Sequence, residues 1–144
     1  MRARSKVQRV EDIRQRILRC LWFDQAFATP PKHTDGGVPL RVFTPGWWNL
    51  EDGPDFRNAA LKLGPSRTVK GDIEVHLRAS DWTKGGHDKD ASYNGVILVV
   101  CLWNDTGQRA VRTAGGAEVP QLTLEPLLSE EKLCELQAAA MRVT

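Results

Sequence analysis

Apolar residues recur at helical intervals near the start of the chain, and arginines fill several of the positions between them. The apolar positions are Val7, Val10, Ile13, Ile17, Leu18 and Leu21. This periodicity predicts an amphipathic helix over residues 6–27. Ser5, followed three residues later by Gln8, has the spacing of a capping box, and Pro30 and Pro31 stop the helix.

Two segments further along carry the clearest strand patterns. In residues 71–78, apolar and ionisable side chains alternate with a period of two, which is typical of a strand. Residues 96–103 form a continuous apolar run, which favours a central strand covered on both faces. Further strands are expected at residues 38–43, 56–63, 110–113 and 119–124, with an irregular polar segment at 81–94 and a final helix capped by Ser129.

The order of these elements predicts an α/β fold with a single mixed β-sheet flanked by helices. A chain of 144 residues is long enough to bury one self-sufficient core. We expect residues 1–128 to form one α/β domain that includes the N-terminal amphipathic helix, and residues 129–144 to form a C-terminal helix.

Composition excludes several classes of protein. With 41% hydrophobic and 26% charged residues, the chain is neither a membrane protein, a fibre nor wholly disordered. Its three cysteines are odd in number and lack metal-binding spacing, which favours a reducing compartment over a disulfide framework or a structural zinc site. No apolar region follows the basic N-terminus as in a signal peptide, and the longest apolar run, at residues 96–103, is too short to span a membrane, so we expect a cytoplasmic protein without a membrane partner. The sequence identifies no protein partner.

The net charge of +2 is too small to imply nucleic-acid binding, but charge is uneven along the chain. Residues 1–19 carry seven basic and two acidic side chains, whereas residues 118–144 carry two basic and five acidic ones. The basic start is either a solvated helix face or a surface that lies near phosphate groups.

The alternation in residues 71–78 puts four ionisable side chains, those of Asp72, Glu74, His76 and Arg78, on one face of a strand. Neighbouring side chains on such a face are about 6.5 to 7 Å apart. Carboxylates this close repel each other unless a cation lies between them or the pKa of one rises. A hard divalent cation such as Mg²⁺ accepts carboxylate oxygens, activates water and polarises a phosphoryl oxygen.

A further carboxylate, that of Asp55, precedes the strand expected at residues 56–63. If the two strands form a hairpin, Asp55 comes close to Glu74. Direct pairing of the two residues, however, would put the apolar face of one strand on the polar face of the other. A consistent core therefore requires a bulge in the hairpin, or an Asp55 that lies just outside its strand.

Pro54-Asp55 followed by Glu74-Val75-His76 resembles the PD-(D/E)xK nuclease signature, with His76 where that family has lysine. The order of helices and strands also resembles that family's restriction-endonuclease-like core. The resemblance implies that Asp55 and Glu74 bind Mg²⁺ or Mn²⁺, and that His76 takes the lysine's role towards the attacking water. Histidine titrates near pH 6.5, so it can act as a base or as a ligand, but it is not a permanent cation.

Four other residues complete this hypothetical site. Asp72 is a further candidate metal ligand on the same strand face, and Arg78 and Lys84 are candidates for contact with the phosphate. His87 lies in a glycine-containing loop. It either contacts the substrate or a metal ligand from above the carboxylates, or is an ordinary surface histidine.

A more specific resemblance covers about residues 18–128. The segments that carry it are Pro45-Gly46, Trp48-Asn49, Gly53 to Phe56, Gly71 to Arg78, Ser80 to Trp82, Gly86-His87, Asp90, Tyr93-Asn94, Val96 to Leu98 and Asn104-Asp105. They resemble a bacterial domain-of-unknown-function family whose activity is not established. Its members are usually longer, which implies that this chain corresponds to their N-terminal part. The family commonly has histidine at the positions of Gly85 and Val99.

These observations support three hypotheses about function. The first is a divalent-metal-dependent phosphodiesterase of nuclease type that acts on DNA or RNA. The second is a non-catalytic binding or structural domain, for which the strand face would be solvated and Glu74 would pair with Arg78 or Arg57. The third is a different metal hydrolase that uses His76 and His87 together with Asp72, a site weakened by the departures at positions 85 and 99.

Overall fold

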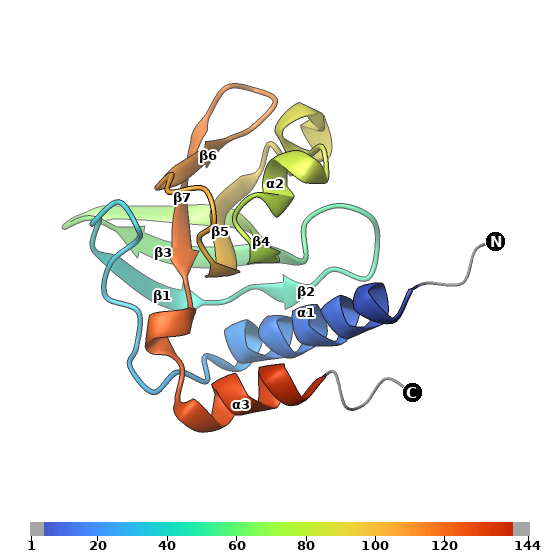
Figure 1. The fold of residues 1–144 in the computed structure, drawn as a ribbon. Helices are drawn as coiled ribbons and strands as arrows, with labels where there is room; N and C mark the ends of the chain where they lie inside the picture. Colours follow the sequence, from blue (N-terminus) through green and yellow to red (C-terminus); the bar gives the residue numbers. More distant parts are fainter. Residues whose placement is uncertain (1–4, 140–144) are drawn as a thin grey trace.

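The computed structural model describes residues 5–139 and shows a mixed β-sheet with helices on both faces (Figure 1). The helices are α1 (Lys6–Asp24), α2 (Asp81–Lys84) and α3 (Glu130–Ala138), with short 3-10 turns η1 (His87–Lys89), η2 (Ala91–Tyr93) and η3 (Glu125–Leu127). The strands are β1 (Leu40–Thr44), β2 (Trp47–Trp48), β3 (Phe56–Leu63), β4 (Arg67–Arg78), β5 (Val96–Trp103), β6 (Ala110–Arg112) and β7 (Glu118–Thr123). The predicted α/β class with one mixed sheet is confirmed.

The sheet has the strand order β1-β3-β4-β5-β7-β6, with β2 paired to the start of β3. Strands β3 and β4 form an antiparallel hairpin, whereas β5 runs parallel to both β4 and β7. The apolar run of β5 therefore lies in the middle of the sheet, as predicted, and its side chains from Leu98 to Leu102 are buried on both faces.

Helix α1 covers one face of the sheet, and α3 packs beside it (Figure 1). The side chain of Ser5 accepts a hydrogen bond from the N–H of Gln8, as the sequence predicted, and Ser129 caps α3 in the same way. The predicted C-terminal end of the first helix was wrong. Helix α1 stops at Asp24 because Gln25 adopts a left-handed conformation with φ 51° and its N–H bonds back to the last turn. The predicted extension of the last helix to residue 144 falls outside the described residues.

A bulge near the start of β3 resolves the register of the hairpin. Phe56 pairs with Ile73, but Ala59 pairs with Gly71, so the register shifts by one residue between these two pairs. Asn58, inside the bulge, has a positive φ of 60°. Asp55 lies just before β3. Both of the alternatives that would give a consistent core are therefore present, and the side chains of Phe56 and Ala59 are buried in the core.

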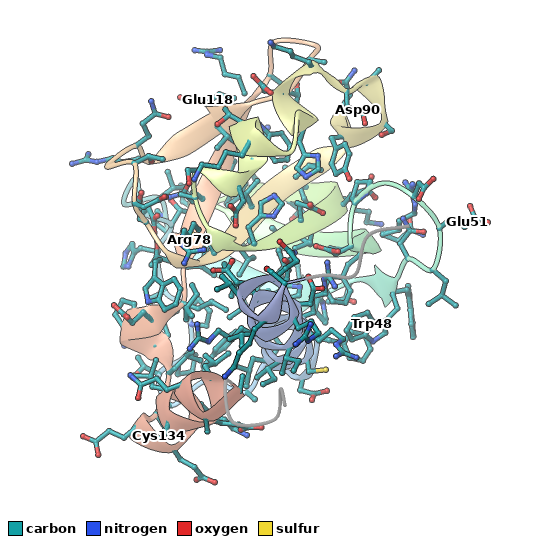
Figure 2. The ribbon with its side chains drawn as sticks, turned by 45° about the vertical axis from the view of Figure 1, so that its right-hand side comes forward. Trp48, Glu51, Arg78, Asp90, Glu118 and Cys134 are labelled. Atoms are coloured by element: carbon teal, nitrogen blue, oxygen red, sulfur yellow. The ribbon has the colours of Figure 1, made fainter. Side chains whose placement is uncertain are left out.

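The segment of residues 81–94 covers the opposite face of β4 and β5. In Figure 2 this segment, marked by Asp90, and helix α3, marked by Cys134, lie on opposite sides of the sheet. Trp82 and Tyr93 anchor the segment, since both are buried in a second apolar cluster with Val99. The side chains of Glu74 and His76 consequently face a covering layer, and the alternative of a solvated strand face was wrong at these two positions: the side chain of Glu74 is only 5% exposed.

Within residues 5–139, no helix combines the length and the apolar character that crossing a membrane requires.

Candidate metal centre

Glu74 is the centre of a buried cluster on the covered face of β4. Its Oε1 accepts a hydrogen bond from the backbone N–H of Asp55, with an N···O distance of 3.1 Å. Its Oε2 lies 3.3 Å from Nε2 of His76 and 3.2 Å from Nε2 of His87. The two histidine side chains are 6% and 15% exposed. Three donor atoms, from β4 and from the covering segment, thus meet at one enclosed point.

Asp55 brings a second carboxylate to this cluster from the start of β3. Its Oδ2 accepts a hydrogen bond of 2.8 Å from the backbone N–H of Val75. Its Oδ1 forms an ion pair of 2.9 Å with Nε of Arg19 in α1. The Asp55 side chain is 13% exposed, so its charge is also largely removed from water. The predicted approach of Asp55 to Glu74 is therefore what the fold produces.

Helix α1 positions Arg19 through a row of polar contacts. Residues 11, 15 and 19 are spaced by four and lie on one side of the helix. Glu11 pairs with Arg78 at 2.9 Å, and Nε2 of Gln15 donates to the backbone carbonyl of Val75 at 3.1 Å. These contacts hold α1 along the second half of β4, so the next side chain in the row, Arg19, reaches Asp55.

Burial determines the electrostatics of the two carboxyl groups. It raises the pKa of Asp55 to about 7, with the charge of Glu74 as a further cause, while Arg19 and the N–H of Val75 act in the opposite direction. Burial likewise raises the pKa of Glu74 to about 7, although its hydrogen bonds with Asp55 oppose the shift. Near neutral pH the two carboxyl groups therefore hold a proton readily, and a cation that binds beside them would displace this proton.

The two histidines are neutral for the same reason. Burial lowers the pKa of His76 to about 3, assisted by the charges of His87 and Arg19. Burial also lowers the pKa of His87, against the charges of Asp55 and other acidic residues. Neutral imidazole is the form that binds metal ions.

Two of the three separations between the donor atoms fit a bound metal ion. Ligand atoms about 2.1 Å from a tetrahedral or octahedral ion lie about 3.0 to 3.4 Å from one another. The separations of Glu74 Oε2 from the two imidazole nitrogens fall in this range, and all three atoms lie within 4.8 Å of one another. Nε2 of His76 is buried and makes no hydrogen bond with the other described residues, which is an unfavourable arrangement unless another atom occupies the space between the ligands.

Aromatic rings fix the orientation of His87. Its ring stacks on Tyr93 with a centroid distance of 4.0 Å and lies parallel to the ring of His76 at 5.1 Å. Trp82 meets it edge-on at 5.5 Å, and the indole N–H of Trp82 is anchored by the carbonyl of Arg112. His87 is thus a fixed member of the cluster, and the alternative of an ordinary surface histidine was wrong.

Asp72, Arg78 and Lys84, three of the predicted site residues, belong to other contacts. The carboxylate of Asp72 pairs with Arg57 at 3.4 Å, at the point where the chain enters β5. Arg78 pairs with Glu11. Lys84 is the last residue of α2, and its positive charge helps to lower the pKa of Asp105. The pairing of Glu74 with Arg78 or Arg57 that a solvated strand face would have required was therefore wrong.

Sequence reasoning missed Arg19 and Tyr93 as site residues. Arg19 was one of several arginines on a predicted helix, and only the polar row at positions 11, 15 and 19 distinguishes it. Tyr93 lies in an irregular segment whose path over the sheet has no periodic signal in the sequence. The positions of Gly85 and Val99, where the resembled family commonly has histidine, both border the cluster. A Cβ atom at Gly85 would lie 3.0 Å from Nε2 of His87, and Val99 pairs with Glu74 across β4 and β5.

Comparison with known proteins identifies a family but no characterised relative. A family model described as "Protein of unknown function (DUF2851)" matches residues 15–142, most of the chain. This confirms the resemblance to a family of unknown function. No curated protein and no solved structure matches the chain.

Proposed function

The chain belongs to the DUF2851 family of proteins of unknown function, and we propose that it is a divalent-metal-dependent phosphodiesterase of nuclease type that acts on DNA or RNA. The observation that carries the proposal is the meeting of Glu74 Oε2 with Nε2 of His76 and Nε2 of His87 at metal-ligand separations, with a second carboxylate alongside. In this proposal Glu74, His76 and His87 hold the cation and Asp55 acts on the attacking water.

The donor set favours Mn²⁺ over Mg²⁺. Mg²⁺ prefers oxygen ligands, whereas imidazole nitrogen suits transition metals, and Mn²⁺ accepts both kinds of donor. Two of the three candidate ligands here are histidines. The sequence suggested an all-carboxylate site of Asp55, Glu74 and Asp72, but Asp72 pairs with Arg57 instead. We therefore propose Mn²⁺ as the first cation to test and Mg²⁺ as the comparison.

The proposed reaction is hydrolysis of a phosphodiester. A divalent cation held by Glu74 and the two histidines supplies Lewis acidity towards a phosphoryl oxygen and lowers the pKa of water. Asp55 acts as general base, because a carboxylate with a pKa of about 7 accepts a proton effectively near neutral pH. The water oxygen forms a new bond to phosphorus and one phosphorus–oxygen ester bond breaks. The leaving oxygen takes a proton from solvent, so the products are a phosphate monoester and an alcohol.

The topology around the site supports phosphodiester chemistry over other hydrolysis. Asp55 precedes the first strand of a hairpin, and Glu74 and His76 lie on its second strand. A short helical crossover then leads to a parallel neighbour, β5. This is the arrangement that the resemblance to the PD-(D/E)xK core implies. The three cysteines are not in disulfides, which suits the cytoplasm, where DNA and RNA are available.

The enclosure of the site favours a second candidate function. Structural metal sites are closed, whereas catalytic sites keep an open position. The side chains of Glu74, His76 and His87 are each at most 15% exposed. The second candidate is therefore a non-catalytic module in which the same cation fastens the segment of residues 81–94 to β4.

Cleavage assays with two site variants separate these functions. We expect the wild-type protein with Mn²⁺ to cleave single-stranded or double-stranded DNA or RNA, and Glu74→Gln to lose both Mn²⁺ binding and cleavage. Asp55→Asn should retain Mn²⁺ binding and lose about 10²- to 10⁴-fold in rate, the usual contribution of a general base. Glu51→Gln, in an exposed loop whose side chain points away from the body of the protein (Figure 2), is the matched control. Mn²⁺ binding without cleavage of any of these substrates would leave the second candidate, and absence of Mn²⁺ binding would overturn both.

A further inference from the structure

We propose that Arg19 binds the phosphate group of the substrate, with its guanidinium oriented by Asp55. This inference rests on the proposed function and adds to it a residue from outside the strands, on helix α1. It also gives one of the arginines at the basic start of the chain a role towards phosphate.

The pairing of Arg19 with Asp55 engages one nitrogen of its guanidinium, Nε. Nε, which is itself buried, pairs with Oδ1 of Asp55 at 2.9 Å. The side chain as a whole is 29% exposed, so the exposed part lies on its other atoms. A guanidinium has five N–H donors in a rigid fork, and a contact through Nε leaves the others for a second partner. Arg19 can therefore contact Asp55 and a phosphate oxygen at the same time.

The charge balance of the cluster also points to Arg19. Glu74 and Asp55 bring two carboxyl groups to the cluster, and Arg19 is the arginine that pairs with one of them, at 2.9 Å from Asp55. With a divalent cation bound, the charges of the cation and of Arg19 together exceed the negative charge of Asp55 and Glu74. This excess positive charge favours an anionic ligand at the edge of the site.

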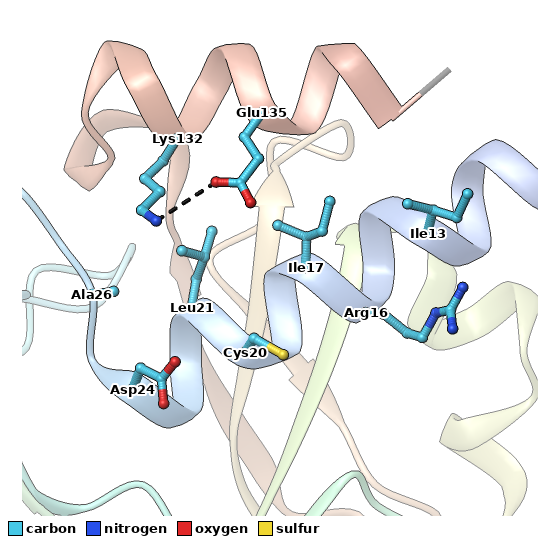
Figure 3. A pocket seen from close by; sticks show the side chains of 9 residues that line it. All are labelled: Ile13, Arg16, Ile17, Cys20, Leu21, Asp24, Ala26, Lys132 and Glu135. Atoms are coloured by element: carbon cyan, nitrogen blue, oxygen red, sulfur yellow. Dashed lines mark ion pairs between the residues drawn. The ribbon is translucent and has the colours of Figure 1, made fainter. Parts of the chain in front are cut away.

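Other arginines near the site have different partners. Arg78 is occupied by both carboxylate oxygens of Glu11, and Nε of Arg14 donates to the carbonyl of Leu136 in α3. Arg16 lines a groove between α1 and α3, together with Cys20 and the ion pair of Lys132 with Glu135 (Figure 3). Arg16 is therefore a matched control: it has the same charge and lies on the same helix, but it lines this groove, whereas Arg19 pairs with Asp55.

The test measures two affinities by calorimetry at pH 8, that of each variant for Mn²⁺ and that of the Mn²⁺-loaded protein for inorganic phosphate. Arg19→Gln keeps an N–H donor for Asp55 but removes the charge. We expect it to bind Mn²⁺ about tenfold more tightly, because a repelling charge is lost, and phosphate about 10- to 100-fold more weakly. Arg19→Lys keeps the charge and should give Mn²⁺ affinity near that of the wild type with an intermediate loss for phosphate. Arg16→Gln should leave both affinities unchanged.

The outcomes distinguish this inference from the proposed function. Unchanged phosphate affinity in Arg19→Gln, with Mn²⁺ still bound, overturns the inference alone. Weaker Mn²⁺ binding in Arg19→Gln also overturns it, because Arg19 would then hold the metal cluster together instead of binding phosphate. Failure of the wild type to bind Mn²⁺ overturns the proposed function and this inference together. If Arg19→Gln does not fold, equal phosphate affinities of Arg19→Lys and the wild type overturn the inference.

Discussion

The backbone N–H of Asp55 donates a hydrogen bond to the carboxylate of Glu74, and the carboxylate of Asp55 accepts one from the N–H of Val75, the next residue along β4. These reciprocal contacts bind the start of β3 to the middle of β4 and bring two buried carboxyl groups together. The bulge in β3 makes the contact compatible with a core-facing Phe56. The site is thus a consequence of the same one-residue shift that lets the hairpin bury its apolar face.

Mn²⁺ affinity should rise as the pH increases from about 6 to about 8. Binding requires an ionised Glu74, and burial raises the pKa of this carboxyl group to about 7. His76 contributes no dependence in this range, since its pKa is lowered to about 3 and it is already neutral. Calorimetric titrations in buffers of different ionisation enthalpy measure the protons released. An affinity that is constant between pH 6 and 8 contradicts this electrostatic account.

Glu74→Gln should stabilise the metal-free protein at pH 8. A carboxyl group whose pKa is raised on folding contributes stability below its unfolded pKa, near 4.5, and loses that contribution as the pH rises through about 7. Its removal should recover up to about 3 kcal/mol in the free energy of unfolding, from the size of that shift. Urea titrations at pH 5 and pH 8 test this, with Glu51→Gln as control. His76 acts in the opposite sense, since its lowered pKa removes stability as the pH falls from about 6.5 towards 3.

His87→Gln should weaken Mn²⁺ binding by more than about 100-fold. Loss of a residue that only hydrogen-bonds to a metal ligand usually costs roughly 10- to 100-fold in metal affinity. A larger loss is expected here because His87 supplies one of three donor atoms and is held in place by stacking on Tyr93. His33→Gln, an exposed histidine near β1, is the control. Equal losses in the two variants would mean that binding occurs elsewhere on the surface.

Gly71→Ala should destabilise the protein by about 1–3 kcal/mol, the usual cost of overpacking. A Cβ atom at this position would lie 2.6 Å from both the carbonyl oxygen of Gly95 and a methyl carbon of Ile97, where the crossover enters β5. Gly36→Ala is the matched control, since its nearest neighbours would be 3.8 Å away. Thermal unfolding gives the comparison, and equal melting temperatures for the two variants would contradict the close approach of β4 and β5 in this region.

Local patterns were sufficient to predict most of the fold. The alternation in β4, the continuous apolar run of β5 and the caps at Ser5 and Ser129 each depend on neighbouring residues, and all are confirmed. The end of α1 was missed because a left-handed Gln25 is unusual and the apolar pattern continues beyond it. The two-residue strand β2 was missed because its pairing with β3 is a tertiary contact.

The site was only partly predictable because one of its three candidate ligands, His87, comes from a segment without periodicity. Spacing and register were enough to bring Asp55 to Glu74. His87 lies against Glu74 because Trp82 and Tyr93, in the same segment of residues 81–94, pack into an apolar cluster on the sheet. No local sequence pattern encodes this packing. The alternation in β4 gave the direction of the polar side chains but not their burial, so their shifted pKa values could not be foreseen.

The most direct test of the metal centre is anomalous X-ray scattering from crystals of the protein soaked in Mn²⁺. The account predicts one peak about 2.0 to 2.3 Å from Oε2 of Glu74, Nε2 of His76 and Nε2 of His87, and loss of this peak in Glu74→Gln crystals. A map with no peak between these three atoms, and with Glu74 hydrogen-bonded directly to both imidazoles, would contradict it.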